Sequence, residues 1–388
     1  MRDRIINRNV MKQIFTFVFL FCSSLFAGAQ NEFFDLSPDG ATLLSLTPTG
    51  KGQPAITIPA TISKVKSGAF KSAIVQNLKI EGNPEFEANL YGKSESESES
   101  GSDSQLLSVN MGSAMTADNI KAMLLSLGER GVLEEVLIEG FADPDMPDIQ
   151  WENASLKQVL TEEVHVKLPP QLVTDEQKFG DAQVMGRFHL TSEIITFCGN
   201  ASFLDQDDGS HWLFYIPTAK QVYEGEGDDK GKEMIYIRRV RVIPAGKGVL
   251  IHNIDNTARY ADLLRAASLV PDIYKQNMLK GVLKDTDIKA TDGDKTNLIL
   301  YNGSFYPTSS GTFPAFKAYL QIPTASWNKA ALARWTPRFD DETTAIDALQ
   351  TDAAATSEDG PMYNMAGQRV ANDYKGLIIQ NGKKKIVK

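Results

Sequence analysis

The chain has 388 residues, of which 42% are hydrophobic, and its formal net charge is −9. This length is sufficient for two or three domains, each with its own core. The negative charge repels phosphate backbones, which excludes nucleic acid as an expected partner.

Residues 1–29 have the features of a secretory signal peptide. Lys12 supplies a positive charge, Ile14 to Leu25 is mostly apolar, and Ala27-Gly28-Ala29 places small residues at a signal peptidase site. The apolar run is too short to remain as a membrane-spanning helix. We therefore expect cleavage and export to the cell surface or medium, with no transmembrane anchor. Cleavage would leave Cys198 as the only cysteine, so no intrachain disulfide could form.

Residues 30–180 have the texture of a repeat domain. Ile56 and Ile58 alternate as in a half-buried strand, and Pro59 ends that strand because it lacks a backbone donor. Strand-like segments return with a period in the twenties, which is typical of a leucine-rich solenoid. In the best repeat we expect a single buried core formed by Ile58, Ile62, Val65 and Phe70.

The segment Ile56 to Phe70 reads Ile-x-Ile-Pro-x-x-Ile-x-x-Val-x-x-x-Ala-Phe. This pattern resembles the leucine-rich repeats of BspA-like surface proteins of Bacteroidetes. The resemblance implies a short, irregular solenoid whose concave strand face binds another molecule. The later segments Leu133 to Ile138 and Leu156 to Leu168 follow the pattern less closely.

One helix and one polar insert are predicted within the repeat domain. Thr116 can cap the helix and Gly128 can end it. Ser94 to Ser104 contains only Ser, Glu, Gly and Asp, so it has no apolar surface to bury and is expected to be a disordered loop. Weak metal binding by its carboxylates is the alternative. The apolar face of the helix should contain Ile120, Met123, Leu124 and Leu127.

Residues 183–325 contain longer predicted strands separated by turn material, which favours a β-sandwich. Phe316 to Ile322 alternates cleanly between apolar and polar residues, whereas Thr257 to Ala267 is predicted as a short helix. The remaining strands are predicted at Phe188–Cys198, His211–Val222, Lys232–Ile243, Gly248–Asn253 and Asn297–Tyr306.

This region also resembles a β domain that is frequent at the C-terminal end of secreted repeat proteins of Bacteroidetes. The resemblance implies an architectural role and carries over no catalytic residue. The motifs that match in order are Ile195-Thr-Phe-Cys-Gly199, Val240 to Ile251, Asn277 to Gly281, Phe305-Tyr-Pro and Pro314 to Leu320.

Residues 326–360 are predicted to be a linker, and residues 361–388 a small β unit. That unit should contain strands at Met365–Val370 and Leu377–Gln380, with Asn381-Gly382 as a tight turn into Lys383–Val387. Its pattern Tyr-Asn-x-x-Gly-Gln-Arg-Val and its lysine-rich end resemble the C-terminal tails of secreted Bacteroidetes proteins, including the end of type IX sorting domains. The resemblance implies sorting or surface attachment, and the alternative is a short sheet that closes the chain.

No pattern of catalytic, metal-binding or cofactor-binding residues is found. The four histidines, His165, His189, His211 and His252, lack the spacing of a zinc site. Asp205 to Gly209 begins like a calcium loop, but Ile216 stands where that loop needs a glutamate. Cys198 lies in an apolar run and is expected to be a buried hydrophobic residue.

Aromatic residues are the remaining candidates for ligand binding. Trp212, Phe214 and Tyr215 lie in one predicted strand, where Trp212 and Phe214 share a face and Tyr215 points away. They form either part of a core or a platform on which a sugar stacks. Trp151, Trp327 and Trp335 lie in less regular segments and are candidates for exposed side chains.

The sequence therefore favours a mainly β protein with some α structure: a short irregular leucine-rich-repeat solenoid, a β-sandwich and a small C-terminal β unit. The expected function is that of a secreted or cell-surface, adhesin-like protein, not an enzyme, that binds a protein or glycan through its repeat domain. The alternatives are a carbohydrate-binding protein that uses the sandwich aromatics, and a hydrolase with dispersed carboxylates.

Overall fold

The computed structural model describes residues 30–92, 106–128, 133–143, 149–205, 211–222, 233–254, 259–267, 270–326, 335, 337, 339, 362–364, 369–370, 376–380 and 383–387. The fold is mainly β, with several sheets and a few short helices. It divides into two compact units, residues 1–338 and residues 339–388. The predicted signal peptide, the Ser94 to Ser104 insert and Trp327 lie outside the described residues.

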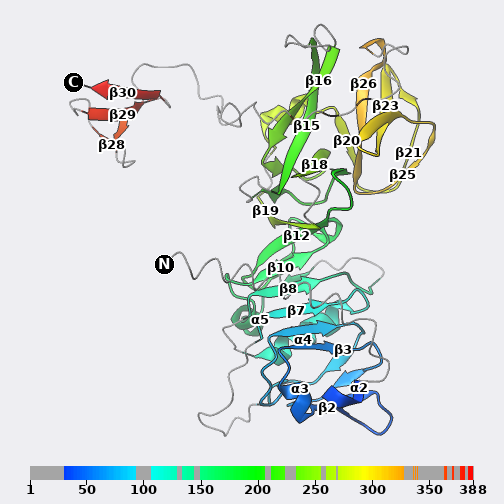
Figure 1. Ribbon diagram of the computed structural model, residues 1–388, viewed down its shortest axis with the longest axis vertical. Helices are drawn as coiled ribbons and strands as arrows, with labels where there is room; N and C mark the ends of the chain where they lie inside the picture. The colour runs from blue at the N-terminus through cyan, green and yellow to red at the C-terminus, as the bar shows by residue number, and fades with distance from the viewer. Residues whose placement is uncertain are drawn as a thin grey trace. The chain divides into compact units, whose positions relative to one another are not determined.

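The largest sheet has nine strands in the order β17-β14-β19-β12-β10-β8-β7-β5-β3. Six neighbouring strands of this sheet are parallel to one another, and their order in the sheet follows their order along the chain. Figure 1 shows them stacked one above another. They are β3 (Ala55–Ile58), β5 (Asn77–Ile80), β7 (Ser108–Met111), β8 (Glu135–Ile138), β10 (His165–Leu168) and β12 (Gln183–His189).

Side chains alternate strictly along these strands between a buried face and an outward face, which is half-buried except for the exposed Gln183 and His189 at the ends of β12. The register places one buried residue of each strand beside the next, so that one apolar row crosses all six strands. This row is Ile56, Leu78, Val109, Val136, Val166 and Val184. A shift of one residue in the pairing of a strand would turn its buried side chains toward solvent. Burial of one face therefore fixes the register.

The segments of chain before and between these strands also contain shorter strands, which pair with one another in separate small sheets. In one sheet β2 (Thr42–Leu46), β4 (Lys64–Val65) and β6 (Glu85–Phe86) are parallel, and β1 (Phe34–Leu36) pairs antiparallel with β2. Strands β9 (Gln150–Trp151) and β11 (Lys178–Phe179) form another parallel pair. The short helices are α2 (Gln30–Phe33), α3 (Pro48–Lys51), η1 (Pro170–Leu172), η3 (Asp272–Gln276) and η4 (Thr324–Ser326).

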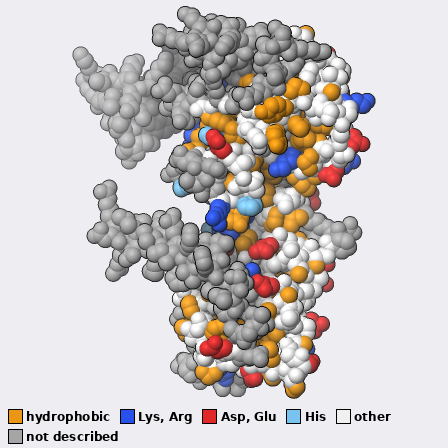
Figure 2. Space-filling view, turned by 45° about the vertical axis from the view of Figure 1, so that its right-hand side comes forward, with side chains coloured by type: hydrophobic (Ala, Val, Ile, Leu, Met, Phe, Trp, Pro, Cys, Tyr) orange, Lys and Arg blue, Asp and Glu red, His pale blue; other side chains and the backbone are white. Residues whose placement is uncertain are grey.

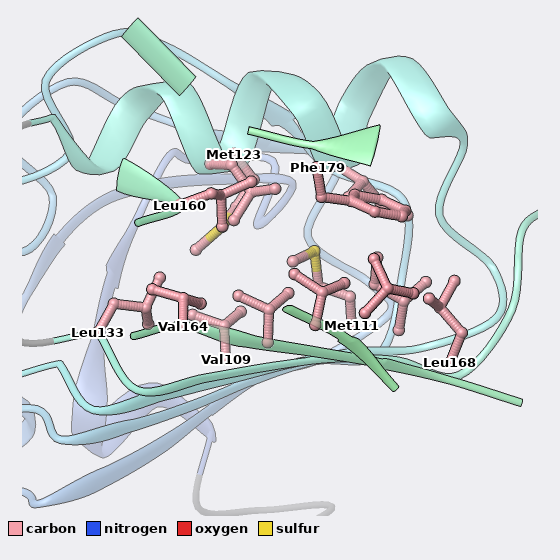
Figure 3. Packing of buried hydrophobic residues seen from close by; sticks show 14 of the residues in the cluster. Val109, Met111, Met123, Leu133, Leu160, Val164, Leu168 and Phe179 are labelled. Carbon is pink, nitrogen blue, oxygen red and sulfur yellow. The ribbon is translucent and has the colours of Figure 1, made fainter. Parts of the chain in front are cut away.

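The apolar face of the parallel sheet packs against two helices, α4 (Ala117–Leu127) and α5 (Ala154–Val159). The predicted helix is confirmed: Thr116 Oγ1 accepts a hydrogen bond from Asn119 N at 3.3 Å, and Gly128 ends the helix at a φ of 69°. Figure 3 shows the packing, with Met123, Leu160 and Phe179 on one side and Val109, Met111, Leu133, Val164 and Leu168 on the other. The predicted core is also confirmed, because one buried cluster contains Ile58, Ile62, Val65 and Phe70.

The predicted helix over Thr257 to Ala267 is wrong, because Tyr260–Arg265 is strand β19. Ala261 and Leu263 are buried, whereas Tyr260 and Asp262 face outward, so the pattern has a period of two. Strand β19 pairs antiparallel with β12 and extends the parallel sheet.

The boundary predicted near residues 180–183 lies inside this sheet, because β12 pairs with β10 on one edge and with β19 on the other. Phe188 to Cys198, predicted as one strand, is divided between β12 and β13 (Ile194–Phe197). Two short strands, β14 (Phe203–Leu204) and β17 (Val242–Ile243), complete the nine-stranded sheet.

Two further sheets of three or more strands follow. The first, sheet D, has the order β13-β18-β15-β16, with β18 at Val249–Asn253, β15 at Trp212–Val222 and β16 at Glu233–Val240. The second, sheet E, has the order β20-β26-β23-β22, and β24 also pairs with β23. Its strands are β20 (Leu279–Val282), β26 (Lys317–Pro323), β23 (Lys295–Tyr301), β22 (Thr291–Asp292) and β24 (Ser304–Pro307). A ribbon of β21 (Thr286–Ile288) and β25 (Gly311–Phe313) accompanies sheet E.

Small residues bring sheets D and E into close contact. A Cβ atom on Gly248 would lie 2.6 Å from Ala318 Cβ, and one on Gly281 would overlap Cys198 Sγ. Ala318 N donates a hydrogen bond to Thr196 Oγ1 at 3.3 Å across the same contact. Larger side chains at either glycine would therefore force the two sheets apart.

Two predicted exposed tryptophans are buried. Trp151 packs edge-on against Phe179, with ring centroids 5.2 Å apart. Trp335 stacks on Phe305 at 5.4 Å, and Trp335 N donates to Phe305 O at 2.8 Å. Because Trp335 is docked on β24, the predicted linker over residues 326–360 is not free of contacts at that position.

The second unit contains one antiparallel sheet in the order β28-β27-β29-β30. Gln380 pairs with Lys383, as a two-residue hairpin across Asn381-Gly382 requires. Of the predicted strand Met365–Val370, the structure describes Arg369 and Val370, which form a strand in which Val370 pairs with Met362. The strands are β27 (Met362–Asn364), β28 (Arg369–Val370), β29 (Gly376–Gln380) and β30 (Lys383–Val387).

Substitution of Phe70 by alanine should lower the free energy of unfolding by about 3–5 kcal/mol, because its fully buried ring would leave a cavity in the core. Denaturant unfolding monitored by circular dichroism measures this change. Ile74→Ala is the control, since Ile74 is 49% exposed and its loss should have little effect. Equal stabilities of the two variants would contradict the assignment of Phe70 to the core.

Candidate functional site

The outward face of the main sheet is the candidate functional site. We use this term for the side chains that alternate with the buried rows on β3, β5, β7, β8, β10, β12 and β19. Adjacent strands are about 4.8 Å apart, so these side chains cover one another and are half-buried. They include Thr57, Asn77, Lys79, Ser108, Asn110, Glu135, Leu137, His165, Lys167, Met185, Arg187 and Asp262.

Four charged side chains form a connected network on this face. Lys167 Nζ lies 2.5 Å from Glu135 Oε2 and 2.9 Å from Asp262 Oδ2. Arg187 binds Asp262 through two parallel bonds, from Nε to Oδ1 and from Nη2 to Oδ2, both at 2.8 Å. Glu135 Oε1 is 3.6 Å from Arg187 Nη2 and closes the network. Two positive and two negative charges therefore balance across β8, β10, β12 and β19.

The network shifts the pKa of two of its members, Asp262 and Arg187. Burial raises the pKa of Asp262, but the hydrogen bond from Arg187 and the charges of Arg187 and Lys167 outweigh burial and hold that pKa below 3.8. Burial lowers the pKa of Arg187, yet its pairing with Asp262 outweighs burial and raises that pKa above its ordinary value. Both groups thus stay charged at neutral pH, and the paired geometry is favoured.

An aromatic pair borders the network. His189 and Tyr260 are cross-strand partners on β12 and β19, and their rings stack with centroids 5.2 Å apart. The Arg187 guanidinium carbon lies 5.6 Å from the centre of the Tyr260 ring, which adds a cation–π contact. Tyr260 is 52% exposed and can contact a partner directly.

The N-terminal part of the outward face is neutral or weakly charged. Ser108 Oγ donates to Asn77 Oδ1 at 2.7 Å, and Lys79 Nζ lies 3.0 Å from Glu81 Oε1. The outward face therefore changes from amide and hydroxyl groups on β5 and β7 to paired charges on β8 to β19. Figure 2 shows one surface of the molecule, on which basic, acidic and histidine side chains lie close together below a region richer in hydrophobic side chains.

The predicted sugar platform at Trp212, Phe214 and Tyr215 is not exposed. Phe214 is fully buried, Tyr215 is 5% exposed, and Trp212 is half-buried against the main core. The reason is that both faces of sheet D are covered: the side chains beside Phe214 enter the main core, and those beside Tyr215 face sheet E. Core packing, the other interpretation of these residues, fits their burial.

The other residues considered for chemistry remain apart. Cys198 is buried against Gly281, and burial raises the pKa of its thiol to about 11. His165 and His189 lie on the outward face, and His252 lies on β18. Within the described ranges no group of three or more His, Cys, Asp or Glu side chains could hold a metal ion. Asp205 is buried, whereas residues 206–210 lie outside the described part.

Sequence reasoning did not identify the charged network. The sequence signal for three of its members was their alternation with buried residues along a strand, at Glu135, Lys167 and Arg187. Asp262 was hidden by the incorrect helix prediction. The pairing itself depends on strand register, which brings together residues as far as 95 positions apart, Lys167 and Asp262.

The chain was compared with protein families, with curated proteins and with solved structures, and nothing matched. In the described part of the chain, no helix is both long and apolar enough to cross a membrane.

The Asp262 carboxylate should make stability depend on pH. Its folded-state pKa is depressed, so its contribution is complete above an unfolded-state pKa of about 3.9 and is lost as pH falls through the folded-state value. Asp262→Asn should lower the free energy of unfolding by about 1.5–3 kcal/mol at neutral pH, and by less in acid. Denaturant unfolding between neutral pH and about pH 2.5 measures both effects. Asp287→Asn, at an exposed carboxylate outside the network, is the control, and a loss for Asp262→Asn that is equal at all pH values would exclude this role.

The Cys198 thiol should resist modification in the folded protein. Its burial and raised pKa keep it protonated and inaccessible at neutral pH. In protein that begins at residue 30, a maleimide reagent should react only after denaturation, as measured by mass spectrometry. Lys289→Cys, at an exposed position, should react at once and serves as the positive control. Rapid labelling of Cys198 in native protein would show that sheets D and E separate readily.

Proposed function

We propose that the chain is an exported interaction protein, without catalytic activity, that binds a partner protein through the outward face of the main sheet. Its repeat region acts as a short, irregular leucine-rich-repeat solenoid, and sheets D and E act as a β-sandwich that supports it. The function is that of an adhesin-like protein at the cell surface or in the medium. The outward face is the observation that carries this proposal.

The sheet topology supports the solenoid. Six parallel strands follow one another in register, and the short strands on a second side repeat the same order. Backbone hydrogen bonds link equivalent turns, such as Lys66 N to Leu43 O and Glu87 N to Val65 O, both at 3.0 Å. Each unit buries its apolar face by stacking on its neighbours, as repeat proteins do.

The outward face has the properties of a protein-binding surface. Its side chains are half-buried and hold one another, so they lose little conformational entropy when a partner docks on them. The balanced charges in the network of Glu135, Lys167, Arg187 and Asp262 fix donor and acceptor positions. Such positions select a complementary partner more than they add affinity.

A glycan-binding function is the second candidate, and one aromatic pair favours it. Tyr301 is 65% exposed at the end of β23, and its ring centroid lies 6.3 Å from that of Tyr306 on β24. Exposed tyrosine rings can stack against the apolar face of a sugar. This pair replaces Trp212, Phe214 and Tyr215 as the aromatic surface to test.

The signal peptide and the C-terminal unit give the proposed location. Cleavage after Ala29 would release the chain for export, and residues 361–388 would serve as a sorting or attachment segment. Both inferences rest on sequence patterns. They place the outward face where a host or surface partner can reach it.

A binding screen with purified residues 30–388 tests this function. Surface-protein and glycan panels should yield a protein partner whose affinity falls about tenfold or more, roughly 1.4 kcal/mol, in Lys79→Glu and Leu137→Glu. Both substitutions alter the outward face, and neither removes a residue of the charged network. Lys289→Glu makes the same charge change at an exposed site near sheet E and should bind normally.

The glycan alternative predicts a different result in the same screen. Tyr301→Ala would then abolish binding to a glycan, while Lys79→Glu would bind like the unaltered protein. That pattern would overturn the proposal for the outward face. Melting temperatures of all variants show whether a loss of binding reflects unfolding.

A further inference from the structure

Arg239, on β16, has buried donors that no described residue of the chain satisfies. Its Nε and Nη2 atoms are inaccessible to solvent and donate to no partner within the residues that the structure describes. Arginine remains protonated in proteins, so these donors carry positive charge. Buried donors without a partner are rare in native structures, and each costs about 1–3 kcal/mol.

The position of Arg239 in sheet D is fixed by register. Arg239 is the cross-strand partner of Tyr215. Tyr215 also pairs with Leu250, and Leu250 in turn pairs with Thr196. Cross-strand partners lie on the same face, and Thr196 Oγ1 on this face accepts a hydrogen bond from Ala318 N of sheet E. The Arg239 side chain therefore starts on the face of sheet D that is directed toward sheet E, on its outermost strand.

The same molecule shows what the unpartnered edge of Arg239 can bind. In Arg187, Nε and Nη2 form two parallel bonds to the carboxylate of Asp262, both at 2.8 Å. These are the two atoms that have no partner in Arg239. The planar fork of a guanidinium matches the two oxygens of a carboxylate, and such bidentate bonds are the strong ones.

The surroundings of Arg239 favour an anion. Arg238 and Arg241 lie beside it in sequence and are exposed, so three arginines occur within four residues of a chain whose net charge is −9. Within the described residues, no ion pair is found for any of the three. On the same face, the Tyr215 ring lies 6.4 Å from the His252 ring, and His252 Nε2 lies 3.8 Å from Glu193 Oε1.

We propose that Arg239 is the anchor of a binding site for a carboxylate-bearing small molecule, which displaces the atoms that cover Nε and Nη2 and then docks side-on against these two donors. Tyr215 and Leu250, its neighbours in the cross-strand row, are largely buried and supply an apolar and aromatic wall. A carboxylate carries one charge and is less costly to desolvate than a phosphate dianion, which suits this partly apolar place. The site is separate from the outward face and does not rest on the proposed function.

Thermal unfolding in the presence of small anions tests the site with the chain of residues 30–388. The probes are sodium acetate, sodium benzoate and sodium glucuronate, with inorganic phosphate and sodium chloride at the same ionic strength. Acetate should raise the melting temperature more than chloride or phosphate, because a ligand that binds only the folded state stabilises it. A larger effect of benzoate identifies an aromatic acid, and a larger effect of glucuronate identifies a sugar acid.

Two substitutions separate binding from a structural role. Arg239→Met should abolish the acetate effect and leave the melting temperature of the free protein unchanged or higher, because it removes unpaired buried donors. Arg239→Lys keeps the charge but loses the fork, and should weaken acetate binding about tenfold. Arg241→Met is the matched control at an exposed arginine and should respond to acetate like the unaltered protein.

Three results would overturn the proposal. One is an acetate effect of equal size in Arg239→Met and the unaltered protein, since binding would then lie elsewhere. Another is a melting temperature of free Arg239→Met that falls by several degrees, which would show that Arg239 holds the sheet together. The third is an equal response to acetate, phosphate and chloride, which would reflect ionic strength alone.

Discussion

Burial of one apolar face by parallel stacking is the constraint on which this structure depends. None of the six parallel strands can bury Ile56, Leu78, Val109 or their equivalents alone, because each strand has only four to seven residues. The next strand must therefore align in register, and the helices α4 and α5 must cover the row. Once this register is set, every second side chain is placed on the outward face at the spacing of the strands. The surface that we propose for binding is thus a consequence of how the core is closed.

The charged network shows how the outward face is held where the sheet changes direction. Strands β10 and β12 are parallel, whereas β12 and β19 are antiparallel, and Lys167, Arg187 and Asp262 connect the three. Partly buried charges lose hydration, and this loss is offset only where geometry is good and each group has partners. The bidentate bond of Arg187 and the shared carboxylate of Asp262 meet that condition. The network therefore contributes a fixed arrangement of side chains more than it contributes net stability.

The parts of the fold that the sequence predicts are those set by neighbours along the chain. The core of Ile58 to Phe70 and the helix from Thr116 to Gly128 depend on periodicity and capping, which a short segment contains. Tyr260 to Arg265 was misassigned because Leu263 and Leu264 suit a helix, and only pairing with β12 makes the segment a strand. Trp212, Phe214 and Tyr215 looked like a binding surface because local alternation cannot show that both faces of a strand are covered. The network and Arg239 were missed for the same reason, since their environments are made by strands distant in sequence.

Arg187 and Arg239 have the same chemistry and differ in where the fold places them. Arg187 lies on β12, which has a neighbouring strand on each side, and the strand β19 brings Asp262 opposite it. Arg239 lies on β16, the edge strand of sheet D, and its single neighbour places Tyr215 opposite it, which bears no negative charge at neutral pH. An interior strand can satisfy a buried guanidinium from within the sheet, because it has two sets of cross-strand neighbours. An edge strand has one set, so a guanidinium that is buried there without a carboxylate in that set must find its anion outside the sheet.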